Sequence, residues 1–323
     1  CEENELTHLD FSNAPQLTMI FCHKNQLTSL DISQCDKLTW VNCSENKLSQ
    51  IDLANKPALS QFVCSENPLT EFNASGATAL KALECTHCGL TSLDLSANKQ
   101  LQGVACGYNQ LTELITTGCT KLNTIYCERN KLQSLDLSTL TALQSLNCYL
   151  NEITTLDFSA CSSAHQLYLE NNKISREQML VLVKSLPTTS ANAEKPAQIA
   201  VYDESYPLEE NVCSKEAVQI ARDKNWAVLY YTKDKKYAPY NGADDQNIER
   251  PWQATKPIVY PTVTSQSLHL TDPNVPSVTC YTVTGEHLFT ISDPGDTLDV
   301  STLPEGAYIL QAGDLVTRFE IRR

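Results

Sequence analysis

The sequence predicts a solenoid of stacked parallel β-strands followed by a small all-β domain. Three observations lead to this fold class. A 21-residue unit recurs eight times between Leu6 and Lys173 without an insertion or deletion. Longer segments with helical and strand patterns follow it, and from Pro257 the hydrophobic pattern changes to an alternation of period two. A fixed period of this length is typical of repeat architectures, in which each unit packs on its neighbours.

The repeat itself aligns to L-T-x-L-D-L-S-x-x-x-x-L-x-x-L-x-C-x-x-N-x, and residues 27–47 are a good copy. Its part L-x-x-L-x-C-x-x-N-x-L matches the leucine-rich-repeat signature, with cysteine in one leucine position. The segment from Trp40 to Cys43 alternates outward and inward side chains, so it is predicted to form a short parallel strand. Residues 1–173 are therefore predicted to be a leucine-rich-repeat solenoid, with a partial first repeat and eight complete units.

Two polar positions of the repeat predict how the coils are held together. A buried asparagine can bond the backbone of its own turn and of the adjacent coil. An aspartate followed by serine is expected to cap a turn, with its carboxylate solvated or hydrogen-bonded because stacked charges repel. The asparagine position holds Asn25, Asn46, Asn67, Asn109, Asn130, Asn151 and Asn172. The aspartate position holds Asp10, Asp31, Asp52, Asp94, Asp136 and Asp157.

Fourteen cysteines suggest a disulfide framework until their spacing is considered. Eight of them occupy one position of the repeat: Cys1, Cys22, Cys43, Cys64, Cys85, Cys106, Cys127 and Cys148. Neighbouring parallel strands hold such side chains near the strand spacing of about 4.8 Å, beyond the usual Cβ separation of about 3.8 Å in a disulfide. We expect a column of buried free thiols that act as small hydrophobic side chains.

Motifs that carry catalysis or bind metals do not emerge from the sequence. The stretch Cys85-Thr-His-Cys88 resembles a redox or metal motif, but Cys88 stands in the asparagine position and a zinc site needs more ligands. No histidine pair has the spacing H-E-x-x-H, and neither G-x-S-x-G nor a phosphate-binding glycine loop occurs. The sequence predicts a non-enzymatic protein with no catalytic residues, no metal and no cofactor.

The segment after Lys173 breaks the period and is predicted to cap the solenoid. A capping box, Ser175-Arg-Glu-Gln178, predicts a helix to about Leu186, and a second helix is predicted from Ser214 to about Lys224. With strands at 198–203 and 227–232, residues 174–232 form a C-terminal cap of two longer helix–strand units.

The remainder of the chain is predicted to be a linker, residues 233–256, and a small β-sandwich, residues 257–323. Strands of the sandwich are predicted at 267–270, 277–283, 287–291, 297–300, 307–312 and 316–321. At the other end, Cys1, Asn4 and Leu6 are in phase with the repeat, so the chain is expected to begin inside an earlier repeat, without its N-terminal cap. A lipidated N-terminal cysteine is the alternative.

Net charge and hydropathy restrict the partners. The net charge is −14 at pH 7, which disfavours nucleic acid and anionic membrane surfaces because both attract a basic face. No apolar run reaches the roughly 18 residues that a membrane-spanning helix needs.

Candidate binding residues lie where outward strand side chains line up on the concave face. Such a surface is polar by default, so exposed apolar and aromatic residues are candidates for contacts with a protein or a sugar. An apolar cluster comprises Met19, Phe21, Trp40 and Val63. A tyrosine strip comprises Tyr126, Tyr149 and Tyr168, with Tyr108 nearby. A trough between them is expected over Ala82, Gly103, Ala105 and Gly107. The alternative explanations are strand propensity of aromatic residues and coverage of the apolar cluster by an N-terminal cap.

The 21-residue repeat with its cysteine column resembles the internalin group of bacterial leucine-rich-repeat surface proteins, and in particular internalin-J-like members. Residues 257–323 are similar to the sorting domain of the type IX secretion system of Bacteroidetes. That similarity rests on Val259-Tyr-Pro261, Tyr281-Thr-Val-Thr-Gly285-Glu286, Leu303-Pro-Glu-Gly306-Ala-Tyr308 and Arg322-Arg323. The chain departs from the pattern at Pro261-Thr-Val, where members usually have Pro-Asn-Pro.

These resemblances imply a Porphyromonas- or Bacteroides-type protein that is secreted or attached to the outer membrane. They also imply a role in adhesion or biofilm formation. The leading hypothesis is a cell-surface protein that binds a protein partner with its concave face. Glycan binding by the same tyrosines and a structural spacer without a specific ligand are the alternatives.

Overall fold

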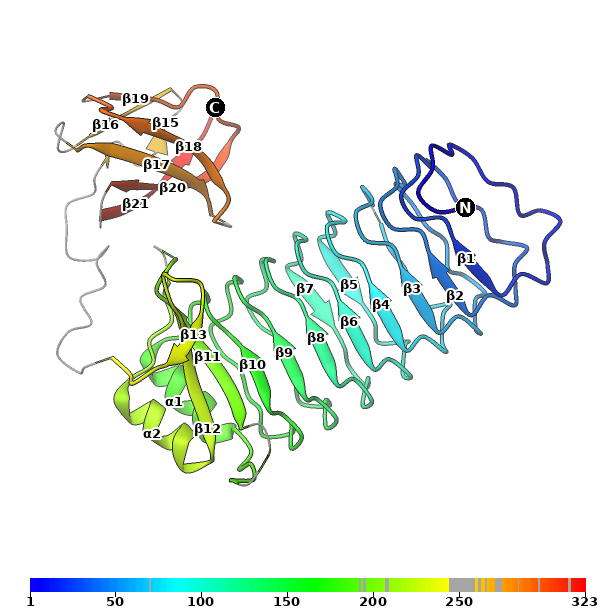
Figure 1. Ribbon diagram of the computed structural model, residues 1–323, viewed down its shortest axis with the longest axis horizontal. Coiled ribbons are helices and arrows are strands. Elements are labelled where there is room, and N and C mark those ends of the chain that lie inside the picture. Colours follow the sequence, from blue (N-terminus) through cyan, green and yellow to red (C-terminus); the bar gives the residue numbers. More distant parts are fainter. Residues whose placement is uncertain are drawn as a thin grey trace. The chain divides into compact units, whose positions relative to one another are not determined.

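The computed structural model describes residues 1–69, 71–191, 193, 196–206, 209–243, 259–260, 263–264, 266–270, 275–283, 285–295, 297–312 and 315–323. The chain divides into two compact units. The first comprises Cys1–Asp203 and Glu209–Gly242, and the second comprises Glu204–Leu208 and Ala243–Arg323. Figure 1 shows the coils of the first unit stacked in sequence order.

An 11-stranded sheet forms the backbone of the first unit. Eight of its strands come from the repeats and pair in parallel, in a register that places residues 21 positions apart side by side. They are β1 (Met19–Phe21), β2 (Trp40–Asn42), β3 (Gln61–Val63), β4 (Ala82–Glu84), β6 (Gly103–Ala105), β8 (Thr124–Tyr126), β9 (Ser145–Asn147) and β10 (Gln166–Tyr168). The middle residue of each is buried. The predicted leucine-rich-repeat solenoid is confirmed.

The opposite wall of the coils carries the aspartate position. Here β5 (Ser92–Asp94) and β7 (Glu113–Ile115) form a second parallel pair. Each aspartate accepts the backbone N–H two residues later, as Asp31 does from Ser33 at 2.9 Å. Hydrogen bonds from Ser33 lower the pKa of Asp31, which confirms the predicted turn-capping role.

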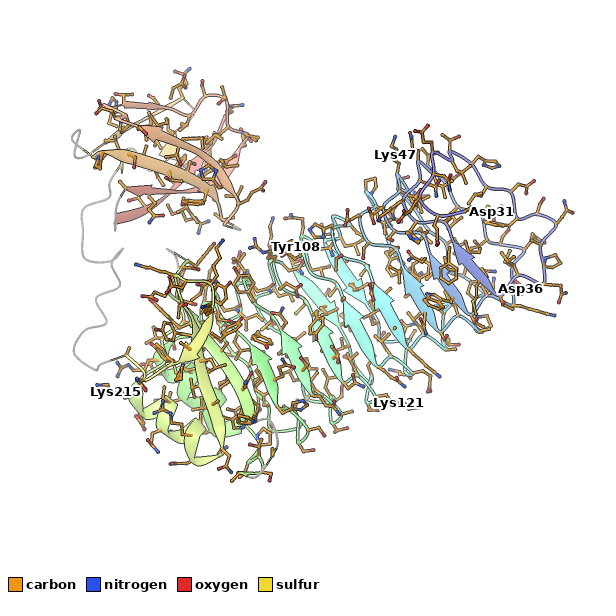
Figure 2. The ribbon with its side chains drawn as sticks, viewed as in Figure 1. Asp31, Asp36, Lys47, Tyr108, Lys121 and Lys215 are labelled. Carbon is orange, nitrogen blue, oxygen red and sulfur yellow. The ribbon has the colours of Figure 1, made fainter. Side chains whose placement is uncertain are left out.

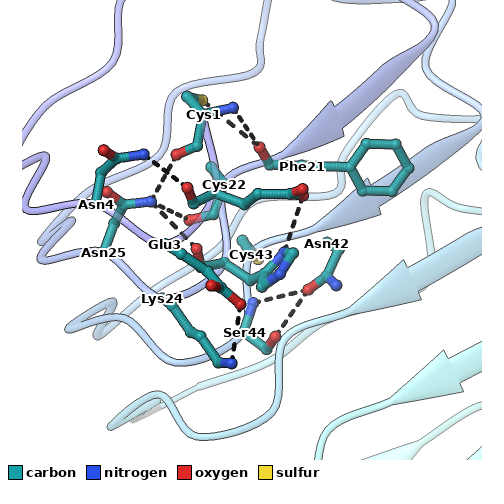
Figure 3. A network of polar contacts seen from close by, with 12 residues as sticks. Cys1, Glu3, Asn4, Phe21, Cys22, Lys24, Asn25, Asn42, Cys43 and Ser44 are labelled. Atoms are coloured by element: carbon teal, nitrogen blue, oxygen red, sulfur yellow. Dashed lines mark hydrogen bonds and ion pairs between the residues drawn. The ribbon is translucent and has the colours of Figure 1, made fainter.

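The asparagine position ties each coil to the one before it (Figure 3). The Asn25 amide donates to the carbonyls of Cys1, Cys22 and His23, at 2.8, 3.1 and 3.2 Å. Its Oδ1 accepts the backbone N–H of Leu6 at 3.0 Å. Because the same bonds recur in the later coils, the buried polar backbone of each turn is satisfied, as predicted.

All fourteen cysteines are free thiols, and every one except Cys1 is buried. Burial raises the pKa of the Cys22 thiol to about 11, so the thiolate that a disulfide exchange needs is disfavoured. Cys88 stands in the asparagine position, where its thiol donates to the carbonyl of Cys64 at 3.4 Å. The predicted column of buried free thiols is confirmed.

The cap continues the sheet with longer units. It consists of α1 (Arg176–Ser185), β11 (Ala197–Asp203), α2 (Lys215–Asp223) and β12 (Trp226–Tyr231). Both helices begin at the predicted serine caps, since Ser175 accepts the N–H of Gln178 and Ser214 that of Ala217. β11 pairs in parallel with β10, and β12 with β11.

The prediction that residues 233–256 are a linker is wrong for their first part. β13 (Tyr237–Pro239) pairs antiparallel with β12 and ends the sheet. The hairpin forms because its aromatic rings find partners: Tyr237 packs on Tyr168, with centroids 5.5 Å apart, and Tyr240 stacks on Tyr202 at 5.7 Å. Residues 244–256 of the predicted linker lie outside the described residues.

The second unit consists of two small sheets, in the strand orders β14-β16-β19 and β15-β21-β20-β17-β18. Its strands are β14 (Val259–Tyr260), β15 (Val263–Thr264), β16 (Ser267–Leu270), β17 (Ser277–Thr282), β18 (His287–Ser292), β19 (Thr297–Asp299), β20 (Gly306–Ala312) and β21 (Leu315–Ile321). One hydrophobic core joins both sheets, with Leu268 and Leu298 from one and Val278 and Leu310 from the other. This is a β-sandwich; β14 and β15, two residues each, were not predicted.

Candidate ligand-binding face

The outward side chains of the 11-stranded sheet, together with those of the turns that directly follow its strands, form one surface, here called the sheet face. At its N-terminal end the register sets Met19 beside Trp40, and the Phe21 and Trp40 rings meet edge to face with centroids 4.8 Å apart. Met19 is 51% exposed and Trp40 36%. Val63 is half-buried on β3, two strands away from Phe21. The structure therefore brings Met19, Phe21 and Trp40 of the predicted apolar cluster together, whereas Asn42 lies between Phe21 and Val63.

The predicted tyrosine strip separates into different environments. Tyr126 projects from β8 and is 41% exposed. Tyr108 lies beyond the strands and is 43% exposed (Figure 2). It stacks on His87 at 4.2 Å, and the Arg129 guanidinium lies 5.2 Å from its ring and 5.5 Å from that of Tyr149. The Arg129 guanidinium thus contacts both Tyr108 and Tyr149. The sequence did not indicate this pair of cation–π contacts.

A left-handed backbone position explains how Tyr108 and Arg129 come to stack. The residue before each asparagine has φ between 52 and 56° throughout the repeats. This conformation is uncommon for residues other than glycine. It places the side chain of Tyr108 at an exposed edge of the coils, whereas Leu150 and Asn171 in the same position of later coils are buried. The residues in this left-handed position are Lys24, Glu45, Glu66, His87, Tyr108, Arg129, Leu150 and Asn171. Large side chains in three successive coils therefore lie one above the next.

The trough expected over the small residues is partly filled. A Cβ atom added to Gly107 would lie 2.8 Å from the carboxylate of Glu128, so that side chain occupies the space above the glycine. Gly103 has no heavy atom within 4 Å of the same test position. The surface is therefore open at Gly103 on β6 but filled at Gly107, because the following coil supplies the long side chain of Glu128.

At the C-terminal end of the sheet face lies a pocket of about 370 Å³. Its lining comes from the coils of β9 and β10 and from β11, β12 and β13: Asn147, Tyr149, Tyr168, Glu170, Asp203, Tyr231 and Tyr237. The Tyr237 ring contacts Tyr168 at 5.5 Å and Tyr231 at 5.2 Å. Gln166 donates to the Tyr168 hydroxyl at 2.8 Å and fixes that ring. Two of the predicted tyrosines, Tyr149 and Tyr168, belong to this pocket.

Two buried carboxylates lie deep in the pocket. Glu170 is 1% exposed and Asp203 2%, while the tyrosines around them are half-buried or exposed. Burial raises the pKa of Glu170 to about 7, and the carboxylate of Asp203 adds to that shift. Asp203 accepts the side-chain amide of Asn171 at 3.0 Å. Burial and the negative charge of Glu170 raise the pKa of Tyr237.

Behind the pocket, Glu209 holds the turn in place. Its carboxylate accepts the backbone N–H groups of Asn171, Asp203 and Asn211, at 2.8, 2.9 and 2.9 Å. One side chain thereby connects the coil after β10, the end of β11 and the loop that follows. Burial raises the pKa of Glu209, and these three hydrogen bonds to its carboxyl group oppose that shift and hold the end of β11 in position.

Sequence reasoning missed five residues of this pocket: Asn147, Glu170, Asp203, Tyr231 and Tyr237. Asn147 and Glu170 occupy outward positions of the repeat, where nothing in the spacing distinguishes them from the other polar residues. For Tyr231 and Tyr237 a usable signal was present. The polar run Lys233-Asp-Lys-Lys236 separates two tyrosine-containing stretches, which is a pattern that favours a hairpin.

Within the described part of the chain, no group of three or more His, Cys, Asp or Glu side chains is placed to hold a metal ion. Over the same residues, none of the helices has the length and hydropathy needed to cross a bilayer.

Comparison with known proteins gives structural matches only. No family model and no curated protein matches the sequence. The functional domain of InlJ from Listeria monocytogenes, described as including a cysteine ladder, has a TM-score of 0.58 at 21% identity. The match covers 98% of this chain, which spans 65% of that structure.

Two further solved structures show the same architecture. The internalin InlF of Listeria monocytogenes has a TM-score of 0.51 at 18% identity, over 70% of this chain and 72% of its own. A leucine-rich-repeat protein of Leptospira interrogans has a TM-score of 0.55 at 20% identity, over 71% and 58%. The chain therefore has the leucine-rich-repeat solenoid fold of internalin-like proteins.

Proposed function

We propose that the protein is a non-enzymatic binding protein that engages a protein partner with its sheet face. The observation that carries this proposal is the set of exposed aromatic rings on a rigid scaffold: Trp40, Tyr108 and Tyr126 are 36, 43 and 41% exposed. Aromatic residues of this kind carry much of the binding energy of protein interfaces. Tyr108 stands outside the strands, so strand propensity does not account for it.

The test compares binding of the labelled full chain to epithelial cells and to bacterial cells. The double variant Tyr108→Ala and Tyr126→Ala is expected to lose at least tenfold in affinity, since two central aromatic contacts are removed. Val181→Ala is the matched control, because Val181 is 54% exposed on α1, away from the sheet. Both variants are expected to keep the melting temperature of the parent chain.

Treating the cells before binding identifies the class of partner. Loss of binding after trypsin treatment supports a protein partner. Loss only after periodate oxidation of surface sugars would favour a glycan. Unchanged binding by the double variant would contradict the sheet face as the contact surface and would favour a spacer.

We also propose that the protein is displayed at the cell surface, in adhesion or biofilm formation, and that residues 257–323 direct its export. The support is the similarity of this segment to sorting domains, including the closing pair Arg322-Arg323. A chain lacking residues 257–323, produced in a bacterium with a type IX secretion system, is expected to remain within the cell envelope. Surface display of that truncated chain, measured by protease shaving of intact cells, would overturn the export proposal.

A further inference from the structure

The pocket at the C-terminal end of the sheet face combines two kinds of group that attract cations. Tyr149, Tyr168, Tyr231 and Tyr237 surround it with aromatic surface. Aromatic faces carry negative electrostatic potential and hold ammonium groups at distances of up to about 6 Å. Deeper in the same space lie the carboxyl groups of Glu170 and Asp203.

Hydrogen bonds offset part of the negative charge in this pocket, but no basic side chain balances it from within the described lining. Its lining contains no lysine or arginine among the described residues. The Tyr237 hydroxyl faces the Glu170 carboxyl group, yet Oε2 of that carboxyl is buried and has no hydrogen-bond partner among the residues that the structure describes. A buried oxygen in this state is unfavourable, and a cationic ligand would supply the missing partner.

The same surface already uses this chemistry one coil away. The Arg129 guanidinium lies over the rings of both Tyr108 and Tyr149. Tyr149 also lines the pocket, so its ring connects the existing cation contact with the pocket. An anionic ligand would face two buried carboxyl groups here. A neutral sugar could donate a hydrogen bond to Oε2 of Glu170 but would not balance the negative charge, whereas an ammonium group does both.

We propose that this pocket binds an organic ammonium group, as in choline or the side chain of lysine, with the tyrosine rings around the cation and Glu170 as its counter-ion. A volume of about 370 Å³ suits a small ligand of this kind. The inference goes beyond the proposed protein-binding function and does not depend on it, because a small cation can be tested without any partner.

The experiment is calorimetric titration of the full chain with choline and with 3,3-dimethyl-1-butanol, its uncharged isostere. Choline is expected to bind at least tenfold more tightly than the alcohol. Nα-acetyl-lysine methylamide, titrated in parallel, distinguishes an amino-acid ammonium from a quaternary one. Binding of either cation in preference to the alcohol supports the proposal. If neither cation binds more tightly than the alcohol, the proposal is overturned.

Variants identify the residues responsible. Glu170→Gln preserves shape and removes the charge, so it is expected to weaken cation binding at least tenfold without lowering the melting temperature. Glu84→Gln, an exposed carboxylate on the same sheet face, is the matched control and is expected to bind normally. Tyr237→Leu gives a second test, because Tyr237 lies on the edge strand and is 45% exposed. Unchanged choline affinity in both Glu170→Gln and Tyr237→Leu would overturn the assignment.

Discussion

Replacing Asn130 with alanine is expected to destabilise the solenoid by about 3 kcal/mol, because one buried amide serves four backbone groups in two coils. The Nδ2 atom donates to the carbonyls of Cys106 and Cys127, each at 3.0 Å, and more weakly to that of Glu128 at 3.3 Å. The Oδ1 atom accepts the N–H of Leu111 at 2.9 Å. Asn130 itself is only 4% exposed, so water cannot readily replace the amide.

The magnitude follows from these bonds. Each lost hydrogen bond contributes about 1 kcal/mol, and a buried group left without a partner costs about 1–3 kcal/mol. Asn130→Asp provides a sharper comparison. It keeps the acceptor for Leu111 but sets a buried charge against the three carbonyl oxygens, so it is expected to cost more than alanine at pH 7.

Urea unfolding of the full chain, followed by circular dichroism, measures the change in the free energy of unfolding. Hydrogen exchange shows where the chain is destabilised, since the Leu111 amide is expected to lose protection. Asn13→Ala is the matched control, because Asn13 is exposed and its loss is expected to cost at most about 0.5 kcal/mol. If Asn130→Ala costs no more than Asn13→Ala, the asparagine position does not hold the coils together.

Cys88 allows the reverse experiment in the same position. Its thiol donates to the carbonyls of Cys64 and Thr86, both at 3.4 Å, while the Leu69 N–H donates to the backbone carbonyl of Asn67 at 2.8 Å. In the other coils the corresponding N–H reaches an asparagine oxygen, as Leu90 does with Asn109. Cys88→Asn is expected to stabilise the chain by about 1 kcal/mol in the same urea assay. A loss of stability would refute this reading of the position.

Two further predictions concern ionisation. Burial raises the pKa of Glu170 from 4.5 to about 7, so the folded chain holds a proton that the unfolded chain releases between these values. The free energy of unfolding is therefore expected to fall by at most about 3 kcal/mol as pH rises from about 4.5 to about 7. Glu170→Gln is expected to flatten this slope. The other titratable groups near Glu170 are Asp203, Glu209 and Tyr237. An unchanged slope in the variant, measured by urea unfolding at several pH values, would contradict the assignment to Glu170. Thiol titration of the native chain is expected to label Cys1 rapidly and the thirteen buried cysteines slowly, with all fourteen reacting in denaturant. Rapid native labelling of many thiols would show that the column is not buried.

The sequence alone was sufficient for the periodic part of the chain. In a solenoid each repeat position has the same neighbours in every coil, so the local pattern is also the contact pattern. The phase of one unit therefore fixed the strand register, the burial of positions such as Asn130, and the free state of the cysteine column. The N-cap residues Ser175 and Ser214 likewise predicted where both helices begin, because an N-cap acts within a single turn.

Contacts between side chains on the sheet face could be predicted only in part. Phe21 and Trp40 share the repeat register, so their meeting followed from the spacing. The contact of Tyr108 with Arg129 did not, because it depends on a left-handed backbone position that turns both side chains outward.

The pocket was decided by the tertiary structure. Tyr237 reaches Tyr168 across 69 residues of sequence because a hairpin ends the sheet where the repeat has already stopped. Burial of Glu170 depends on that hairpin as well, and with it the raised pKa of its carboxyl group. The local spacing of the repeat was enough to predict the solenoid. The pocket lies where the repeat ends, and there contacts between residues far apart in the sequence determine which side chains meet.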